Sequence, residues 1–112
     1  MYRYGDALND VESLADRLQA LPDPVRLRLM QMLPCGEAPC EICVCDLAEQ
    51  LGVSQPNASY HLKVLRSAGL IQCQRRGGYA FYHVDRELLQ GTLSHMDNQL
   101  LSRKPQDQEE DA

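Results

Sequence analysis

Cysteine is the residue type whose placement in this 112-residue chain first indicates chemistry. Four of the five cysteines fall within residues 35–45, and they are Cys35, Cys40, Cys43 and Cys45. Thiolates bind soft metal and metalloid ions; three suit trivalent arsenic or antimony, and four suit zinc, cadmium or lead. The sequence therefore predicts an ion site here, with Cys40, Cys43 and Cys45 as ligands and Cys35 available as a fourth.

The two-residue spacing of Cys43 and Cys45 restricts where this site can lie. On a regular helix, side chains two residues apart point to nearly opposite sides and cannot share one small ion. The site must therefore lie at or before the start of a helix, or the helix must deform when the ion binds. A helix N-terminus also lowers the pKa of a nearby thiol, which favours the thiolate that binds ions.

Other chemistry stays open for the same cysteines. Cys40 and Cys43 have the spacing of a redox dithiol, but the βαβ context of that motif is missing. A structural zinc site, or a switch that works by thiol oxidation, fits the cluster as well. Cys73 lies in a predicted strand and is interpreted as a small buried apolar residue. Because no signal-peptide pattern is present, we expect a cytoplasmic protein with free thiols rather than structural disulfides.

Apolar periodicity and turn residues predict the elements that position these cysteines. The predicted helices cover residues 6–20, 24–33, 46–51, 55–68 and 86–100, and the predicted strands cover residues 70–76 and 79–84. Residues 35–41 are predicted to be a loop. The expected fold class is mainly α (α+β), in the order α-α-α-α-β-β-α.

The boundaries of these elements follow from specific residues. Asp23 and Ser54 are predicted N-caps, each followed by a proline that the first helical turn tolerates. Gly52 is the predicted stop of the short helix. The glycine pair at residues 77–78 predicts a tight hairpin turn. Two helices joined by "LGVS" and followed by a hairpin are typical of a winged helix-turn-helix.

The second helix of this pair has an inner stripe of Ala58, Leu62 and Leu65 and an outer row of polar side chains. Such a helix fits the major groove of DNA, and the basic hairpin tip reaches phosphates or the minor groove. The predicted DNA contacts are Ser54, Gln55, Ser59, Tyr60, His61, Lys63, Arg66, Arg75 and Arg76. For His61, a half-buried packing role is equally open.

Charge is unevenly distributed along the chain. The net charge is −5, although residues 54–86 carry five basic residues against one acidic residue. A basic segment on an acidic body is compatible with a DNA-binding protein, because phosphates respond to the local patch. We expect one domain over residues 1–102 and a disordered acidic tail over residues 103–112. No segment has the apolar length of a membrane span.

The stretches "CVCDLAEQLGVSQPNASYHLKVLRSAGLI" and "RRGGYAFYHV" resemble the ArsR/SmtB family of arsenic- and metal-sensing repressors. The resemblance covers roughly residues 20–90. It implies a homodimer built from the first and last helices, which binds an inverted repeat in double-stranded DNA. It also implies that the DNA is released when an inducer binds.

The sequence departs from the family pattern at the ligands. The arsenic-sensing type has Cys-Val-Cys-Asp-Leu-Cys, but the last position here is Ala48, so Cys40 would have to replace that ligand. A cadmium- and lead-sensing branch recruits cysteines from an N-terminal arm, whereas this chain has none before Cys35. The zinc site that some relatives carry on the last helix lacks its first histidine, although Asp85, His95 and Asp97 remain.

The resemblance and the cysteine cluster together predict a transcriptional repressor rather than an enzyme. Its inducer would be arsenite or antimonite bound by three thiolates. The alternatives are a repressor that responds to cadmium, lead or zinc through Cys35 as well, and a repressor switched by thiol oxidation.

Overall fold

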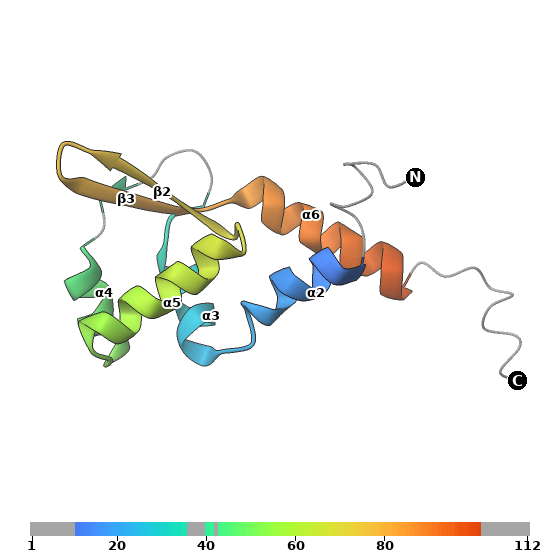
Figure 1. Ribbon diagram of the computed structural model, residues 1–112, viewed down its shortest axis with the longest axis horizontal. Helices are drawn as coiled ribbons and strands as arrows, with labels where there is room; N and C mark the ends of the chain where they lie inside the picture. The colour runs from blue at the N-terminus through green and yellow to red at the C-terminus, as the bar shows by residue number, and fades with distance from the viewer. Residues whose placement is uncertain (1–10, 36–39, 42, 102–112) are drawn as a thin grey trace, which may run out of the picture.

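The computed structural model describes residues 11–35, 40–41 and 43–101. Its elements are α2 (Val11–Gln19), α3 (Pro24–Met32), β1 (Cys40–Glu41), α4 (Val44–Leu51), α5 (Gln55–Ser67), β2 (Ile71–Arg76), β3 (Tyr79–Val84), α6 (Arg86–Met96) and the π-helical turn η1 (Asp97–Leu101). In Figure 1, α3, α4, α5 and the hairpin form one body, and α2 and α6 extend from the same side of it. The predicted fold class is confirmed. The predicted tail and the first residues of the predicted first helix lie outside the described residues.

The start of α3 is fixed by the predicted cap. The Asp23 carboxylate accepts hydrogen bonds from the backbone N–H groups of Val25 and Arg26 at 2.8 and 3.4 Å. Desolvation raises the pKa of Asp23, but these two bonds and the nearby His61 and Arg26 outweigh it and hold the pKa below its ordinary value. Asp23 is therefore a charged cap at neutral pH, where it also complements the helix dipole.

A short corner joins α4 to α5. Gly52 ends α4 in the left-handed conformation, with φ 72°, and its N–H donates to the carbonyl groups of Ala48 and Glu49. Ser54 begins the next helix, because its hydroxyl accepts a bond from the Asn57 N–H at 3.2 Å. Both predictions are confirmed, and the corner holds α4 against α5.

The sheet has one strand more than the sequence predicted. β2 and β3 pair antiparallel from Ile71 with Val84 to Arg76 with Tyr79, around a turn in which Gly77 and Gly78 have φ of 54° and 97°. Residues 40–41, predicted to be loop, form β1 on the other edge of β3. The strand order is β1-β3-β2. The prediction was wrong because a two-residue strand carries no periodicity of its own.

The core lies between α3, α4, α5 and the sheet. It contains Ala20, Leu29, Leu33, Leu47, Leu62, Leu65, Leu70, Ile71, Tyr82 and Val84. Leu62 and Leu65 come from the predicted inner stripe of α5, which is confirmed. Cys73 is partly buried against this core, in agreement with its interpretation as an apolar residue. Burial and the hydrogen bond with Cys73 raise the pKa of Tyr82.

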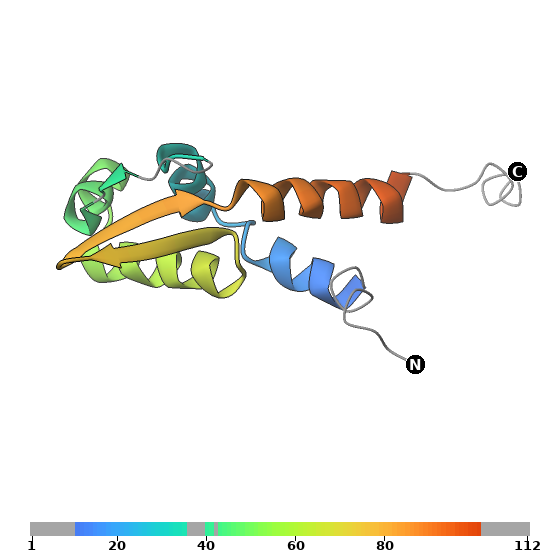
Figure 2. The ribbon, with the colours of Figure 1, turned by 90° about the horizontal axis from the view of Figure 1, so that it is seen from above.

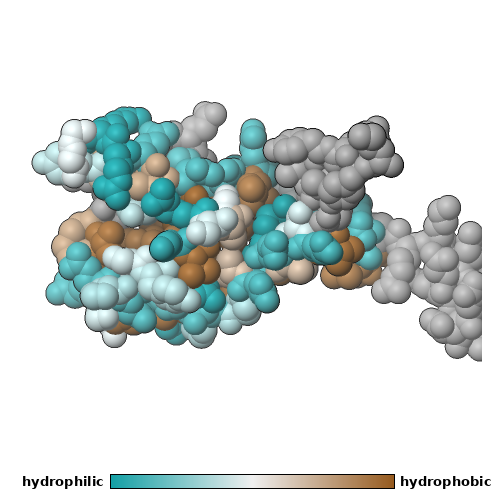
Figure 3. All heavy atoms as spheres, in the orientation of Figure 1, coloured by the Kyte–Doolittle hydropathy of each residue, from teal (hydrophilic) through white to brown (hydrophobic). Residues whose placement is uncertain are grey.

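The helices α2 and α6 pack on one another away from this body (Figures 1 and 2). Their outer surface is apolar: Val11, Leu93, Leu100 and Leu101 are between 51% and 74% exposed. A hollow of about 370 Å³ at the end of α6 is lined by Leu93, Met96, Leu100 and Leu101 together with Asp97. Figure 3 shows hydrophobic surface near this outer end. Exposed apolar side chains gathered in this way make the surface a candidate interaction site.

Among the described helices, none has the length and apolar character needed to cross a membrane.

Candidate metal centre and nucleic-acid interface

Cys43 and Cys45 meet because the helix begins between them. Cys43 is the N-cap of α4, in extended conformation with φ −90° and ψ 124°, whereas Cys45 lies within the first helical turn. Their Cα atoms are 5.3 Å apart, and their Sγ atoms are joined in a disulfide. This placement at the helix N-terminus agrees with the first of the two arrangements predicted for a shared site, and ion binding there stays a prediction. The expectation of free thiols is therefore corrected for this pair, which forms a disulfide in the structure.

Asp46 is a candidate ligand that the sequence reasoning missed. The ligand atoms of Cys43, Cys45 and Asp46 all lie within 4.8 Å of one another, and all three residues are exposed. The position of an acidic residue directly after Cys45 could have indicated this ligand, but the prediction treated Asp46 only as the first residue of a helix. When the disulfide is reduced, this group offers two soft sulfurs and one hard oxygen at the positive end of a helix dipole. Two sulfurs fit a thiophilic ion, and one position remains for a third soft ligand.

The other two clustered cysteines flank β3. Cys40 pairs with Tyr82 in the sheet, and the backbone of Cys35 bridges to Val84. Cys35 is an exposed free thiol that does not belong to the group formed by Cys43, Cys45 and Asp46. The side chain of Cys40 lies outside the described atoms. Its role as third ligand, and that of Cys35 as fourth, stay predictions.

The recognition helix α5 presents the polar row that the sequence predicted. Ala58 and Leu65 are fully buried. The exposed residues on the other side are Ser54, Gln55, Ser59, Tyr60, Lys63 and Arg66. The orientation of these side chains is confirmed, and their contact with DNA stays a prediction.

His61 is the exception in this row. It is only 7% exposed, and its Nδ1 lies 2.9 Å from Nη1 of Arg26 on α3. Its ring also meets that of Tyr60 edge-on, with centroids 5.2 Å apart. The assignment of His61 as a DNA contact is therefore corrected: its side chain points inward and ties α5 to α3.

The hairpin forms a wing with a basic tip. Arg75 and Arg76 are both exposed next to the glycine turn. The Arg76 guanidinium donates to the Gln74 side chain at 2.9 Å and lies 5.3 Å from the centre of the Phe81 ring. These contacts orient Arg76 along the wing, and contact of either arginine with phosphate stays a prediction.

The residues considered as zinc ligands on the last helix make other contacts in the structure. The Asp85 carboxylate caps α6 through the Leu88 N–H and accepts a bond from Gln72. His95 is buried, with Nδ1 3.2 Å from Nη2 of Arg17 on α2. Within the described part of one chain, Asp85, His95 and Asp97 form no metal-binding group.

A helix-turn-helix followed by a basic two-stranded wing defines the winged-helix class of DNA-binding proteins. The family model described as "Bacterial regulatory protein, arsR family" matches residues 23–72, from the cap of α3 into β2. The chain is 34% identical over 86 residues to the arsenical resistance operon repressor of Staphylococcus xylosus, which covers 77% of this chain and 79% of the relative. It is 41% identical over 76 residues to the SmtB homolog of Synechocystis sp., a transcriptional repressor, covering 68% of this chain and 54% of the relative.

Solved structures agree with this fold. The homodimeric winged helix-turn-helix domain of a possible ArsR-family regulator from Mycobacterium bovis superposes with a TM-score of 0.61 at 23% identity, covering 91% of this chain and 92% of that one. The chain belongs to the ArsR family. It is a DNA-binding transcriptional regulator and not an enzyme, as the sequence predicted.

Proposed function

We propose that this chain is a homodimeric repressor that releases its operator when arsenite or antimonite binds the reduced thiols of Cys43 and Cys45, with Cys40 as third ligand. The observation that carries the proposal is the meeting of Cys43 and Cys45 at the first turn of α4. The arsenical resistance repressor among the relatives supports the choice of ion. We place the protein in the cytoplasm, where DNA is bound and thiols stay reduced.

Ion binding at this turn has a short route to the DNA. Leu47 and Ala48 are buried on the inner side of α4. A displacement of α4 therefore also moves the core side chains that pack against these two residues. α4 packs on α5 and joins it through residues 52–54. An ion that draws Cys40, Cys43 and Cys45 together strains the start of α4, and the strain displaces α5 from the groove. The loss of operator-binding free energy equals the free energy by which the ion favours the displaced state over the DNA-binding state.

The proposed dimer uses the apolar surface of α2 and α6. The homodimeric relative supports dimerisation as such. A two-fold dimer carries two recognition helices, and a two-fold operator is an inverted repeat. The proposed DNA contacts are the exposed row of α5 and the arginines of the wing.

A second ion class has its own supporting observation. The carboxylate of Asp46 lies with the two sulfurs, and oxygen ligands suit cadmium, lead or zinc better than trivalent arsenic. The SmtB homolog among the relatives is compatible with this alternative. Replacement of Asp46 by Asn then weakens the response to the divalent ion and leaves the arsenite response unchanged.

The disulfide supports a third candidate, a repressor that responds to oxidation. Two thiols form the disulfide and give two electrons and two protons to an oxidant such as hydrogen peroxide, which is reduced to water. Peroxide alone would then release the operator, and a thiol reductant would restore binding.

The test is fluorescence anisotropy of a labelled inverted-repeat duplex with the reduced protein, titrated separately with arsenite, cadmium and peroxide. We expect release by one equivalent of arsenite per site, lost in Cys43→Ser and Cys45→Ser. Cys73→Ser is the matched control, because Cys73 is a free thiol in β2 that the ion group does not include. Release by cadmium or peroxide alone would select one of the two alternatives. If no agent releases the DNA, the proposal is wrong.

A further inference from the structure

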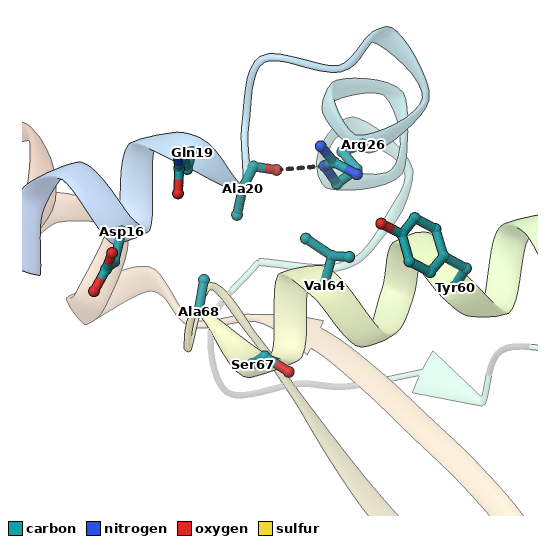
Figure 4. A pocket seen from close by; sticks show the side chains of 8 residues that line it. All are labelled: Asp16, Gln19, Ala20, Arg26, Tyr60, Val64, Ser67 and Ala68. Carbon is teal, nitrogen blue, oxygen red and sulfur yellow. Dashed lines mark hydrogen bonds between the residues drawn. The ribbon is translucent and has the colours of Figure 1, made fainter.

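A second hollow lies away from the cysteines, where α2, α3 and α5 meet (Figure 4). Its volume is about 570 Å³, and its lining includes Asp16 from α2, Arg26 from α3 and Tyr60 from α5. α2 packs on α6 and α3 packs on α5, so the hollow lies where these two packed pairs of helices meet. Because side chains do not fill this space, close packing alone does not set the angle between α2 and the recognition helix α5.

The side chain of Arg26 bridges the two sides of the hollow. Its Nε donates to the carbonyl oxygen of Ala20, directly after α2, at 2.7 Å, and Figure 4 shows this bond. Its Nη1 lies 2.9 Å from Nδ1 of His61, in the middle of α5. A planar guanidinium holds its N–H groups in fixed directions, so the two bonds together fix the position of α5 relative to the end of α2.

The role of His61 in this bridge follows from the chemistry of its partner. A guanidinium has donors and no acceptor, so Nη1 of Arg26 donates and Nδ1 of His61 accepts without a proton of its own. His61 is buried, and a side chain without an acceptor at this position would leave the bond from Arg26 unmade.

The base of Arg26 is held as well. The Asp23 carboxylate caps α3 and accepts a bond from the Arg26 backbone N–H at 3.4 Å. The other helix of the pair is attached separately, because the Asp85 N–H before α6 donates to the Leu70 carbonyl at 2.9 Å. Arg26 is therefore an attachment on the α2 side, and Asp85 is an attachment on the α6 side.

We propose that Arg26 is a positioning residue that sets the separation of the two recognition helices in the dimer, and hence the half-site spacing preferred in the operator. The inference rests on the proposed dimer through α2 and α6 and on its inverted-repeat operator. In that dimer, a change in the angle between α2 and α5 acts twice on the distance between the two copies of α5. Each base pair moves a half-site by about 3.4 Å and turns it by about 34°, so this angle decides which spacing fits.

The test measures the spacing preference of the reduced, ion-free full chain. Random-sequence duplexes are first selected by binding to the unchanged chain, which gives the half-site and its dominant spacing. Fluorescence anisotropy then gives the affinity for that duplex, for duplexes with one or two base pairs added or removed between the half-sites, and for a single half-site. We expect the unchanged chain to bind the dominant spacing at least about tenfold more tightly than the altered spacings.

Removal of the bridge should remove this preference. Arg26→Gln should bind all the spacings within about threefold of one another, because α2 then takes several angles to α5. Its affinity for the single half-site should stay unchanged, whereas a general loss of folding would lower that affinity too. Arg28→Gln is the matched control, because Arg28 is an exposed arginine on the same helix that does not line the hollow, and it should keep the full preference.

Two variants of His61 separate the bond from packing. His61→Asn keeps an acceptor, because its amide oxygen is attached to Cγ as Nδ1 is, and it should keep the spacing preference. His61→Leu fills the buried space without an acceptor and should lose the preference. A role in packing alone predicts the opposite order of the two variants. This pair also keeps the test valid if Arg26→Gln disturbs folding.

The inference is wrong if the unchanged chain has no dominant spacing, if Arg26→Gln keeps the tenfold preference, or if His61→Leu keeps it and His61→Asn loses it. It is also wrong if Arg26→Gln weakens binding to every duplex equally, the single half-site included. Since the experiment contains no inducer ion, such a failure is distinct from a failure of the proposed ion response. Sedimentation equilibrium of the unchanged chain separately tests the dimer.

Discussion

Replacement of Leu93 by Ala should dissociate the proposed dimer. Leu93 lies on the outer side of α6 and is 58% exposed in the single chain. The substitution removes three carbons, each worth about 0.8 kcal/mol when fully buried. Burying the exposed 58% therefore contributes about 1.4 kcal/mol per protomer. A two-fold interface contains the residue twice, so the dimer loses about 2.8 kcal/mol and its dissociation constant rises about 100-fold.

The assay is sedimentation equilibrium over a range of protein concentrations, with operator binding measured at the same concentrations. Leu27→Ala is the control, because Leu27 is 48% exposed on α3, away from the α2–α6 surface. We expect Leu27→Ala to dimerise normally. Urea unfolding of the Leu93 variant as a monomer should change by less than about 0.5 kcal/mol, as is usual at exposed positions. An unchanged dimerisation constant for Leu93→Ala would refute the assignment of this surface to the dimer.

Three further predictions concern DNA binding, pH dependence and the core. Lys63→Gln should reduce the slope of log K against log salt by about 0.9 per protomer, measured by anisotropy, if the exposed Lys63 contacts a phosphate. Asp23→Asn keeps a capping side chain but removes a charge whose pKa is lowered by folding. The original chain should therefore be more stable than this variant near neutral pH, and urea unfolding should show the difference vanish as the pH falls below the ordinary range of aspartate. Leu65→Ala should destabilise the chain by about 2–5 kcal/mol in the same assay, because Leu65 is fully buried in the core.

Local signals in the sequence were enough to predict most of the elements. The caps at Asp23 and Ser54, the stop at Gly52 and the glycine turn of the wing all depend on residues within a few positions of the boundary. The meeting of Cys43 and Cys45 was predictable in part, because their spacing favours a position at a helix terminus over one within a regular helix.

Features that depend on distant residues could not be predicted. β1 exists because its backbone meets β3, which lies about forty positions later in the sequence. The inward turn of His61 depends on Arg26, which comes from another helix. The hollow lined by Asp16, Arg26 and Tyr60 combines residues from three helices, and none of them is unusual in its own segment. Long-range packing decides such features, and periodicity does not report it.

The pairing of β1 with β3 has a mechanical consequence for the response. Cys40 is hydrogen-bonded through its backbone to the strand that carries one side of the wing, while Cys43 and Cys45 lie at the start of the helix that supports α5. If residues 40 and 43–45 bind one ion as proposed, the ion therefore acts on β3 and on α4 at the same time. Because α4 supports α5 and β3 belongs to the wing, the proposed response would then displace both predicted DNA contacts in a single event rather than one after the other.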